Sequence, residues 1–340
     1  MIVRSRRIRA LLPIGAVILV AACSSEKEEP GNKAPEEGIG LTKIAPVANG
    51  PDAVLPMDAT PSPDGNDVYF IAFTTMAAED GVGDVRVPAI FKVSASGGAP
   101  TKLHAGKPLG SPFGITISDD GQTLFVADSS ADGDTSEEGA ERSDGRVLSL
   151  PAGGGTPALV AGTEHIIPAG IEVMNGSLYV TGRRDGAPGL FKLPVGGGAL
   201  TSVATGGPFS DPGGVAVAKS GDAYVVDTGS ATSESALASV IKIDPSGKTE
   251  VIHQGIKVGH PAGIALVSGD TAVLVSALDA SEGTDRVYRI ELGSRQVRQH
   301  SAVIGDFSES AGLHRARNAE VYAWADSHAN DTGTVYVLKP

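Results

Sequence analysis

The sequence predicts an all-β fold, a six-bladed β-propeller of four-stranded antiparallel blades, and three observations support this prediction. The 340 residues include 45 glycines but only 4% aromatic residues, as expected where many tight turns separate short strands around a core of Val, Ile, Leu and Ala. No long segment beyond the extreme N-terminus has the 3.6-residue period of an amphipathic helix. Finally, a unit of roughly 50 residues recurs six times along the chain.

The repeating unit is clearest in residues 207–255. Four short apolar runs occur there, GVAVA, AYVVD, SVIKI and TEVIH, and each contains β-branched residues. The joints KSGD and DPSG carry the Gly and Pro residues of tight turns. This order predicts a four-stranded antiparallel meander, in which each strand pairs with the next.

The same pattern continues through the rest of the chain. The first strand of each unit contains one recurring position, which is occupied by Asp58, Gly114, Gly170, Gly214, Gly263 and Gly312. Successive positions are separated by 56, 56, 44, 49 and 49 residues. The third strands match as well, and they begin at Ala89, Arg146, Gly189, Ser239, Arg286 and Thr334. Six such sheets in a ring make one propeller domain of residues 41–340.

The two ends of this domain are expected to meet in one blade. The sequence stops at Pro340, directly after the third strand of the sixth unit, so that unit lacks its outer strand. The leftover segment 42–45, TKIA, resembles the outer-strand start TKLH at 101–104. We therefore expect residues 41–49 to be the fourth strand of blade six, which removes two open sheet edges.

The first 40 residues indicate export and attachment to a membrane. Residues 1–22 combine four arginines with an apolar run of signal-peptide length, too short to span a bilayer. The run ends in Val-Ala-Ala followed by Cys23, which resembles a bacterial lipobox, in which the cysteine thiol receives a lipid. Residues 23–40 are rich in charge, Pro and Gly, as expected of a disordered tether. The expected location is the bacterial cell envelope, with a lipid anchor in the outer membrane and the domain on its periplasmic or surface face.

Acidic residues outnumber basic ones in the chain after residue 22. The formal charge is −13, and it becomes −17 when the four arginines of residues 1–22 are removed. Such a surface repels nucleic acid, so no nucleic-acid partner is expected. The same charge suits a soluble, monomeric domain. Because Cys23 is the only cysteine, no disulfide can form within the chain.

Two stretches of the repeat resemble known propeller blades. GGVAVAKSGDAYVVDTG and FGITISDDGQTLFVADSS are similar to NHL repeats and to blades of gluconolactonase-like and strictosidine-synthase-like propellers. The resemblance covers residues 41–340 and implies the fold, but not an activity. Gluconolactonase-type enzymes hold a divalent cation over the channel mouth through side chains just before the first-strand glycines. The corresponding residues here cannot ligate a cation through their side chains, and they are Phe113, Ala169, Gly213, Ala262 and Ala311.

Several polar residues are nevertheless candidates for a ligand-binding site near the channel. Glu172 and His314 lie two residues beyond the blade glycine, where we align the small residues Thr60, Thr116, Ala216 and Ala265. The other candidates are the acid of blade one, two histidines in inter-blade loops and an arginine in the short loop of blade three, that is Asp58, His165, His260 and Arg183. The alternative is that these polar groups are structural and satisfied within the protein.

The segment 128–145 is the largest loop and holds seven acids against one arginine. Hard cations such as Ca²⁺ prefer several carboxylate and carbonyl oxygens, which makes Asp128, Asp132, Asp134 and Glu137 candidate ligands. Their spacing does not match an EF-hand, so a solvated acidic loop is the alternative. Asp128 and Asp227 also close second strands, where an acid commonly accepts loop N–H groups. No cofactor is predicted beyond this candidate Ca²⁺.

These observations favour a non-enzymatic binding module that presents its loops to a protein, peptide or glycan partner in the envelope. The sequence holds no GxSxG elbow, zinc-type Cys/His cluster, phosphate loop or dinucleotide fingerprint. The alternative is a propeller enzyme with its site at the channel mouth, either a lactonase-type hydrolase or a sugar dehydrogenase that uses pyrroloquinoline quinone.

Overall fold

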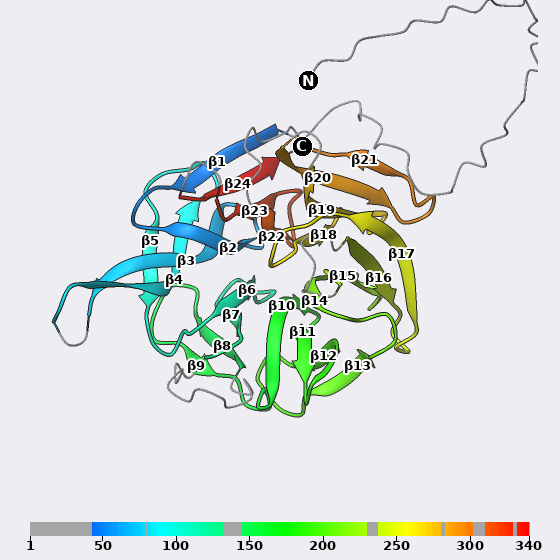
Figure 1. Ribbon diagram of the computed structural model, residues 1–340, viewed down its shortest axis with the longest axis horizontal. Coiled ribbons are helices and arrows are strands. Elements are labelled where there is room, and N and C mark those ends of the chain that lie inside the picture. The colour runs from blue at the N-terminus through cyan, green and yellow to red at the C-terminus, as the bar shows by residue number, and fades with distance from the viewer. Residues whose placement is uncertain are drawn as a thin grey trace, which may run out of the picture. The chain divides into compact units, whose positions relative to one another are not determined.

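A computed structural model of the chain describes residues 43–78, 81–131, 145–229, 237–279, 283–301, 310–328 and 332–339 (Figure 1). By its contacts the chain divides into residues 1–34 and 35–340, and all described residues belong to the second unit. The predicted signal peptide, Cys23 and the predicted tether lie outside the described residues. Within the described part, no helix is long and apolar enough to cross a membrane.

The described strands form six antiparallel sheets of four strands each, which confirms the predicted fold class. Blade one comprises β2 Val54–Pro61, β3 Asp67–Ala77, β4 Asp84–Ser94 and β5 Thr101–Ala105. Blade two comprises β6 Pro112–Ile117, β7 Thr123–Asp128, β8 Arg146–Pro151 and β9 Ala158–Leu159. Blade three comprises β10 Ile166–Met174, β11 Ser177–Arg184, β12 Ala187–Pro194 and β13 Thr201–Thr205.

Blade four comprises β14 Pro212–Val217, β15 Ala223–Asp227, β16 Ala238–Ile243 and β17 Thr249–Ile256. Blade five comprises β18 Ile264–Leu266, β19 Ala272–Asp279, β20 Thr284–Glu291 and β21 Val297–Gln299.

Blade six contains both ends of the domain, as predicted. Its strands are β22 Ser310–Arg315, β23 Tyr322–Asp326, β24 Thr334–Lys339 and β1 Lys43–Asn49. The N-terminal strand β1 pairs antiparallel with β24, from Lys43 opposite Lys339 to Asn49 opposite Thr334 (Figure 1). This pairing closes the ring and covers an edge that β24 would otherwise expose.

Apolar side chains fill the space between neighbouring blades. Between blades one and two, for example, Tyr69 and Ile71 pack with Ile115 and Leu148. The β-branched residues of the repeat alternate along their strands, so one set of side chains faces each neighbouring blade. Full burial of one such side chain stabilises the fold by about 1.5–3 kcal/mol. Because each pair of neighbouring blades has its own apolar cluster, the core is distributed around the ring rather than collected in one place.

The recurring glycines of the first strands occupy positions where blades approach each other too closely for a side chain. A methyl group on Gly114 would lie 2.8 Å from the carbonyl oxygen of Ala169 in the next blade, and one on Gly263 would lie 2.6 Å from that of Ala311. Gly170 and Gly214 meet the next blade's carbonyl in the same way. At the junction of blades six and one, the carboxylate of Asp58 takes the place of this carbonyl and lies against Gly312.

Blade one keeps the predicted alignment. Asp58 pairs with Ile71 as Gly114 pairs with Ala127, so Asp58 occupies the position of the blade glycines. Blade one differs in its bulge, since three residues, 55–57, lie between paired positions where blade four has two. Thr60 pairs with Tyr69 as Glu172 pairs with Tyr179, and is therefore the counterpart of Glu172 and His314.

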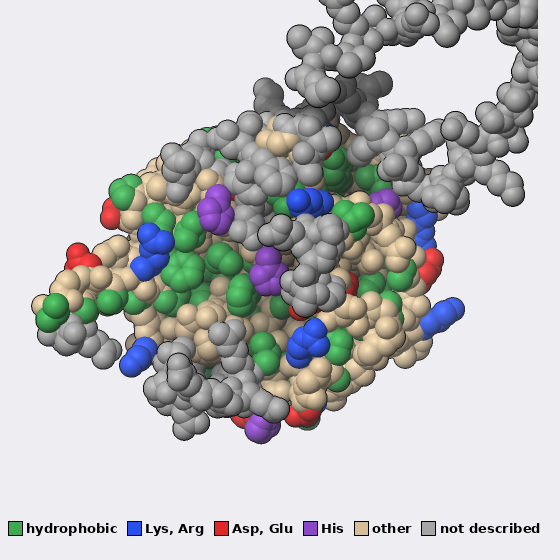
Figure 2. All heavy atoms as spheres, viewed as in Figure 1, with side chains coloured by type: hydrophobic (Ala, Val, Ile, Leu, Met, Phe, Trp, Pro, Cys, Tyr) green, Lys and Arg blue, Asp and Glu red, His purple; other side chains and the backbone are tan. Residues whose placement is uncertain are grey.

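The antiparallel order places the connections on two opposite faces. The turns between first and second strands, and between third and fourth strands, form what we call the hairpin face, with tight turns such as 118–122. The loops between second and third strands and between blades form the loop face. In the space-filling view, a histidine side chain lies near the middle of the visible face, with Lys or Arg side chains on either side of it (Figure 2).

Candidate functional site

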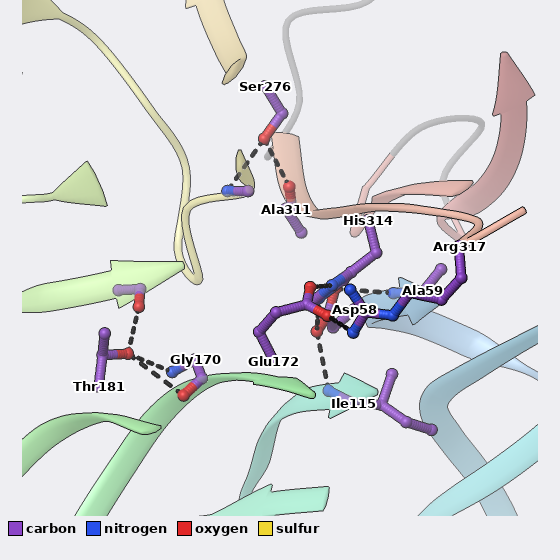
Figure 3. A network of polar contacts seen from close by, with 12 residues as sticks. Asp58, Ala59, Ile115, Gly170, Glu172, Thr181, Ser276, Ala311, His314 and Arg317 are labelled. Carbon is purple, nitrogen blue, oxygen red and sulfur yellow. Dashed lines mark hydrogen bonds and ion pairs between the residues drawn. The ribbon is translucent and has the colours of Figure 1, made fainter. Parts of the chain in front are cut away.

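Three ionisable side chains from three different blades meet at the centre of the ring (Figure 3). His314 on β22 lies between two carboxylates, with its Nε2 3.0 Å from Asp58 Oδ2 and its Nδ1 3.1 Å from Glu172 Oε2. Asp58 comes from β2 and Glu172 from β10, and all three side chains are buried. The structure thus brings together three of the candidates selected from the sequence.

Arg317 completes this group, and sequence reasoning missed it. It lies in the turn after β22, and its guanidinium donates to Glu172 Oε1, while its Nε lies 3.5 Å from Asp119 Oδ1. Because it lies in a turn outside the repeating strand pattern, alignment of the blades gave no reason to select it. The available signal was chemical, since a buried glutamate needs a cation nearby. We call Asp58, Glu172, His314 and Arg317 the axial cluster.

Backbone groups complete the hydrogen bonding of Asp58. Its Oδ1 accepts from the N–H of Ala59 at 2.8 Å, and its Oδ2 accepts from the N–H of Ile115 on β6, also at 2.8 Å. Glu172 has one oxygen on His314 and the other on Arg317. Each of the four carboxylate oxygens therefore has a donor within the protein, and blades one, two, three and six are joined through them.

The carboxylates keep the central histidine charged. Burial alone would lower the pKa of His314, but the charges and hydrogen bonds of Asp58 and Glu172 outweigh burial and raise that pKa to about 10. For Glu172, burial would raise the pKa, yet the neighbouring Arg317 and His314 hold it below its ordinary value. At neutral pH the axial cluster therefore carries two positive and two negative charges in contact.

Two small cavities adjoin the axial cluster. The one toward the loop face has a volume of about 10 Å³ and includes Asp58, Phe113, Pro261, Gly312 and His314 in its lining. The one toward the hairpin face has a volume of about 20 Å³ and is lined by Glu172, Ala216, Val217, Ala265, Leu266, Arg315 and Arg317. As the described residues form them, each cavity holds little more than one water-sized group.

An aromatic ring and a histidine lie together at the mouth on the loop face. Phe113 from blade two and His260 from the loop before blade five make an edge-to-face contact, with ring centroids 5.4 Å apart and an interplanar angle of 67°. His260 is exposed and Phe113 is partly buried. The candidate His260 thus lies over the channel mouth, and its ring remains accessible to a partner.

The remaining ligand candidates lie away from the axial cluster. His165 is exposed in the loop that precedes β10, with a φ of 63°. Arg183, near the end of β11, donates to the carbonyl oxygens of Ser210 and Gly186, and so connects the loop of blade three with the following inter-blade loop. In this position Arg183 organises the loop face of two neighbouring blades.

The acids that close second strands serve their loops. Asp128 accepts N–H groups of Gly110, Ser111 and Ser130 at 2.8–2.9 Å. Asp227 accepts the corresponding N–H groups of Ser210, Asp211 and Gly229. This loop-capping role is the one expected for both acids. The other candidate Ca²⁺ ligands, Asp132, Asp134 and Glu137, lie outside the described residues.

The described residues do not fit a divalent cation at the channel mouth. They contain no group of three or more His, Cys, Asp or Glu side chains that could hold a metal ion. The positions expected to ligate one carry Phe113, Ala169, Gly213, Ala262 and Ala311. The carboxylates nearest the axis, Asp58 and Glu172, already contact a histidine and an arginine. A cation would have to displace those donors.

Comparisons with known proteins agree with the fold. No protein-family model and no curated protein sequence matches the chain. Among solved structures, the chain is similar to an aldose sugar dehydrogenase from Streptomyces coelicolor with bound pyrroloquinoline quinone (16% identity, TM-score 0.56, covering 90% of this chain and 99% of that one). It is also similar to a gluconolactonase-like protein, with 14% identity, a TM-score of 0.55, and coverage of 89% of this chain and 93% of that one.

A third similar structure is TolB from Acinetobacter baumannii, with 13% identity, a TM-score of 0.52 and coverage of 74% of this chain. The chain spans 56% of that protein's length. At these identities the similarity concerns the architecture alone, which serves binding proteins and enzymes alike. The chain is therefore a six-bladed β-propeller that resembles gluconolactonase-like and TolB propellers in fold.

Proposed function

We propose that this protein is a non-catalytic binding propeller, which presents its loop face to a protein, peptide or glycan partner in the bacterial envelope. The observation that carries the proposal is the saturation of the axial cluster, in which every oxygen of Asp58 and Glu172 accepts a hydrogen bond from the protein. The groups at the centre of the ring are thus committed to holding blades together.

Catalysis at the axis would need different properties. A general base must be able to accept a proton near neutral pH, whereas the contacts of His314 with two carboxylates keep it protonated. Metal-assisted hydrolysis needs carboxylate oxygens that are free to bind the metal ion, and an open coordination position on that ion for water or substrate. The oxygens of Asp58 and Glu172 already accept hydrogen bonds from the protein. The cavity of about 10 Å³ toward the loop face also excludes a sugar lactone from the axis.

The loop face has the features of a contact surface. Phe113 and His260 place rings at the centre of this face, and aromatic groups of this kind often anchor interfaces. Arg183 and the capping acids Asp128 and Asp227 hold the surrounding loops in defined positions. A lipid on Cys23 would keep this surface at the membrane, near an envelope partner, since a tether raises the effective concentration of partners on the same membrane.

Site-specific photocrosslinking in cells tests the proposal. A photoreactive amino acid replaces His260 on the loop face, and in a matched variant it replaces Lys248, which is exposed in a turn of the hairpin face. We expect a discrete crosslinked envelope product from position 260 and none from position 248. Equal labelling from both positions would contradict the proposal. Turnover of sugar lactones by the purified protein that Asp58→Asn abolishes would instead assign it to the enzymes.

A further inference from the structure

The cavity on the hairpin-face side of the axial cluster is lined asymmetrically. Blades four and five contribute the apolar residues Ala216, Val217, Ala265 and Leu266, of which the two alanines leave the space open. The opposite side carries charged groups, namely Glu172, Arg315 and Arg317. The result is a recess of about 20 Å³ on the axis, in which apolar side chains face a group of mainly cationic ones.

Arg315 has hydrogen-bond donors that the described residues do not use. Its side chain is 17% exposed, and its ion-pair partner is Glu320, with a separation of 3.9 Å between Nη1 and Oε2. That separation is too long for a hydrogen bond. Glu320 accepts instead from Tyr322 and, at 3.3 Å, from the N–H of Ser268, both through Oε1. A mostly buried guanidinium thus lines the recess without a hydrogen-bonded acceptor among the described residues.

The acid in the lining cannot serve as that acceptor in its present arrangement. Glu172 has one oxygen on His314 Nδ1 and the other on Arg317. Arg317 in turn is shared between Glu172 and Asp119, whose Oδ1 is 3.5 Å from its Nε. The lining therefore carries two guanidinium groups against one carboxylate that is already paired. Glu320 and Asp119 balance the charges of Arg315 and Arg317, at 3.9 and 3.5 Å. What the recess offers to a ligand is therefore the unused hydrogen-bond donors of Arg315.

We propose that this recess is a binding site for a small anion, with Arg315 as its principal donor and Arg317 beside it. The volume suits a single atom-sized anion such as chloride, or the oxygen end of a carboxylate that enters from the hairpin face. A guanidinium binds either through charge-assisted N–H donors. The site lies on the face opposite the proposed partner surface, so it is independent of the proposed function.

Thermal unfolding at constant ionic strength tests the proposal. The Tm is measured at pH 7 in the sodium salt of a bulky sulfonate, an anion that is too large for the recess. Sodium chloride or sodium acetate then replaces that salt in increasing proportion. Because a ligand that binds only the folded state stabilises it, the Tm should rise saturably, by about 2 °C or more at tenfold excess over Kd. A rise with both anions identifies a site for free small anions, and a rise with acetate alone identifies a carboxylate site.

Three variants locate the effect. Arg315→Gln should remove the anion-dependent rise, whereas Arg298→Gln, which removes an arginine paired with Glu291 on an outer strand, should keep it. Ala216→Val retains both arginines of the recess but fills part of it, and should weaken the response, which keeps the test usable if Arg315→Gln does not fold. A wild-type Tm that is independent of the anion would overturn the proposal, as would an equal rise in all variants.

Discussion

His314 connects three blades electrostatically. It comes from blade six and contacts carboxylates from blades one and three, while Asp58 also accepts an N–H from blade two. Most buried ion pairs gain little over apolar packing, since their attraction is offset by the cost of removing two charges from water. Breaking such a group by removing one member is costly, because the remaining charges stay buried without compensation.

We therefore expect His314→Gln to lower the free energy of unfolding by about 3–5 kcal/mol at pH 7. Glutamine has a similar reach but no charge, so Asp58 and Glu172 would face each other across a neutral group. His165→Gln is the control, since His165 is exposed and its substitution should change stability by less than about 0.5 kcal/mol. Urea unfolding of the three proteins measures both values.

The same residue gives a defined pH dependence. The pKa of His314 in the fold is about 10, above its ordinary 6.5, so its contribution is fully present below about pH 6.5 and is lost as pH rises through 10. The stability difference between wild type and His314→Gln should thus be largest below neutral pH and shrink toward pH 10. A difference that stays constant between pH 6.5 and 10 would show that His314 is not held charged.

The sequence could predict part of this site for a physical reason. First strands near the axis mostly carry small residues, so Glu172 and His314 were conspicuous there, and Asp58 was the acid nearest the expected mouth. Their mutual contact could not be predicted, because it depends on how blades one, three and six approach one another at the axis, where the carboxylate of Asp58 lies against Gly312. Arg317 lies outside the repeat, and only the three-dimensional arrangement brings it to Glu172.

At the scale of the element, the repeat itself was the strongest signal. The glycines that marked each first strand are required by the close approach of adjacent blades, and such a requirement is visible in a sequence as a regular spacing. Blade one carries Asp58 at this position, and the strand register confirms the alignment, since Asp58 pairs with Ile71 as Gly114 pairs with Ala127. The longer bulge of blade one could not be predicted, because a bulge of different length leaves no mark on the hydrophobic pattern.

Gly263→Ala tests whether these glycines are needed for space. The added methyl group would lie 2.6 Å from the carbonyl oxygen of Ala311, closer than real carbon–oxygen contacts of this type, so two blades must separate. We expect a loss of about 1–3 kcal/mol, typical of overpacking. Gly196→Ala is the matched control, because no atom lies within 4 Å of the added methyl and no positive φ is required there. Equal unfolding midpoints in urea would refute this explanation.

At the scale of the whole domain, the junction of blades six and one is where the ring is closed by non-covalent contacts. The β1–β24 ladder lies at its outer side, and the Asp58–His314 contact lies at the axis. Between them, Leu55 N donates to Thr332 O at 2.7 Å and Ser327 donates to Pro56 O at 2.9 Å. Without β1, strand β24 would present an unpaired edge at this junction, so stability should depend strongly on β1.

Two truncations measure that dependence. A soluble form that begins at residue 39 should unfold at nearly the same temperature as one that retains residues 24–38, since the composition of those residues predicts no packed core. A form that begins at residue 51 lacks β1, its ladder to β24 and the buried side chains of Val47 and Ala48. The loss of a ladder and its apolar contacts should cost several kcal/mol, on the order of 3–5, and lower the Tm by roughly 6–20 °C. Equal melting temperatures for the forms that begin at residues 39 and 51 would mean that β1 contributes nothing to closure, and that blade six is stable with three strands.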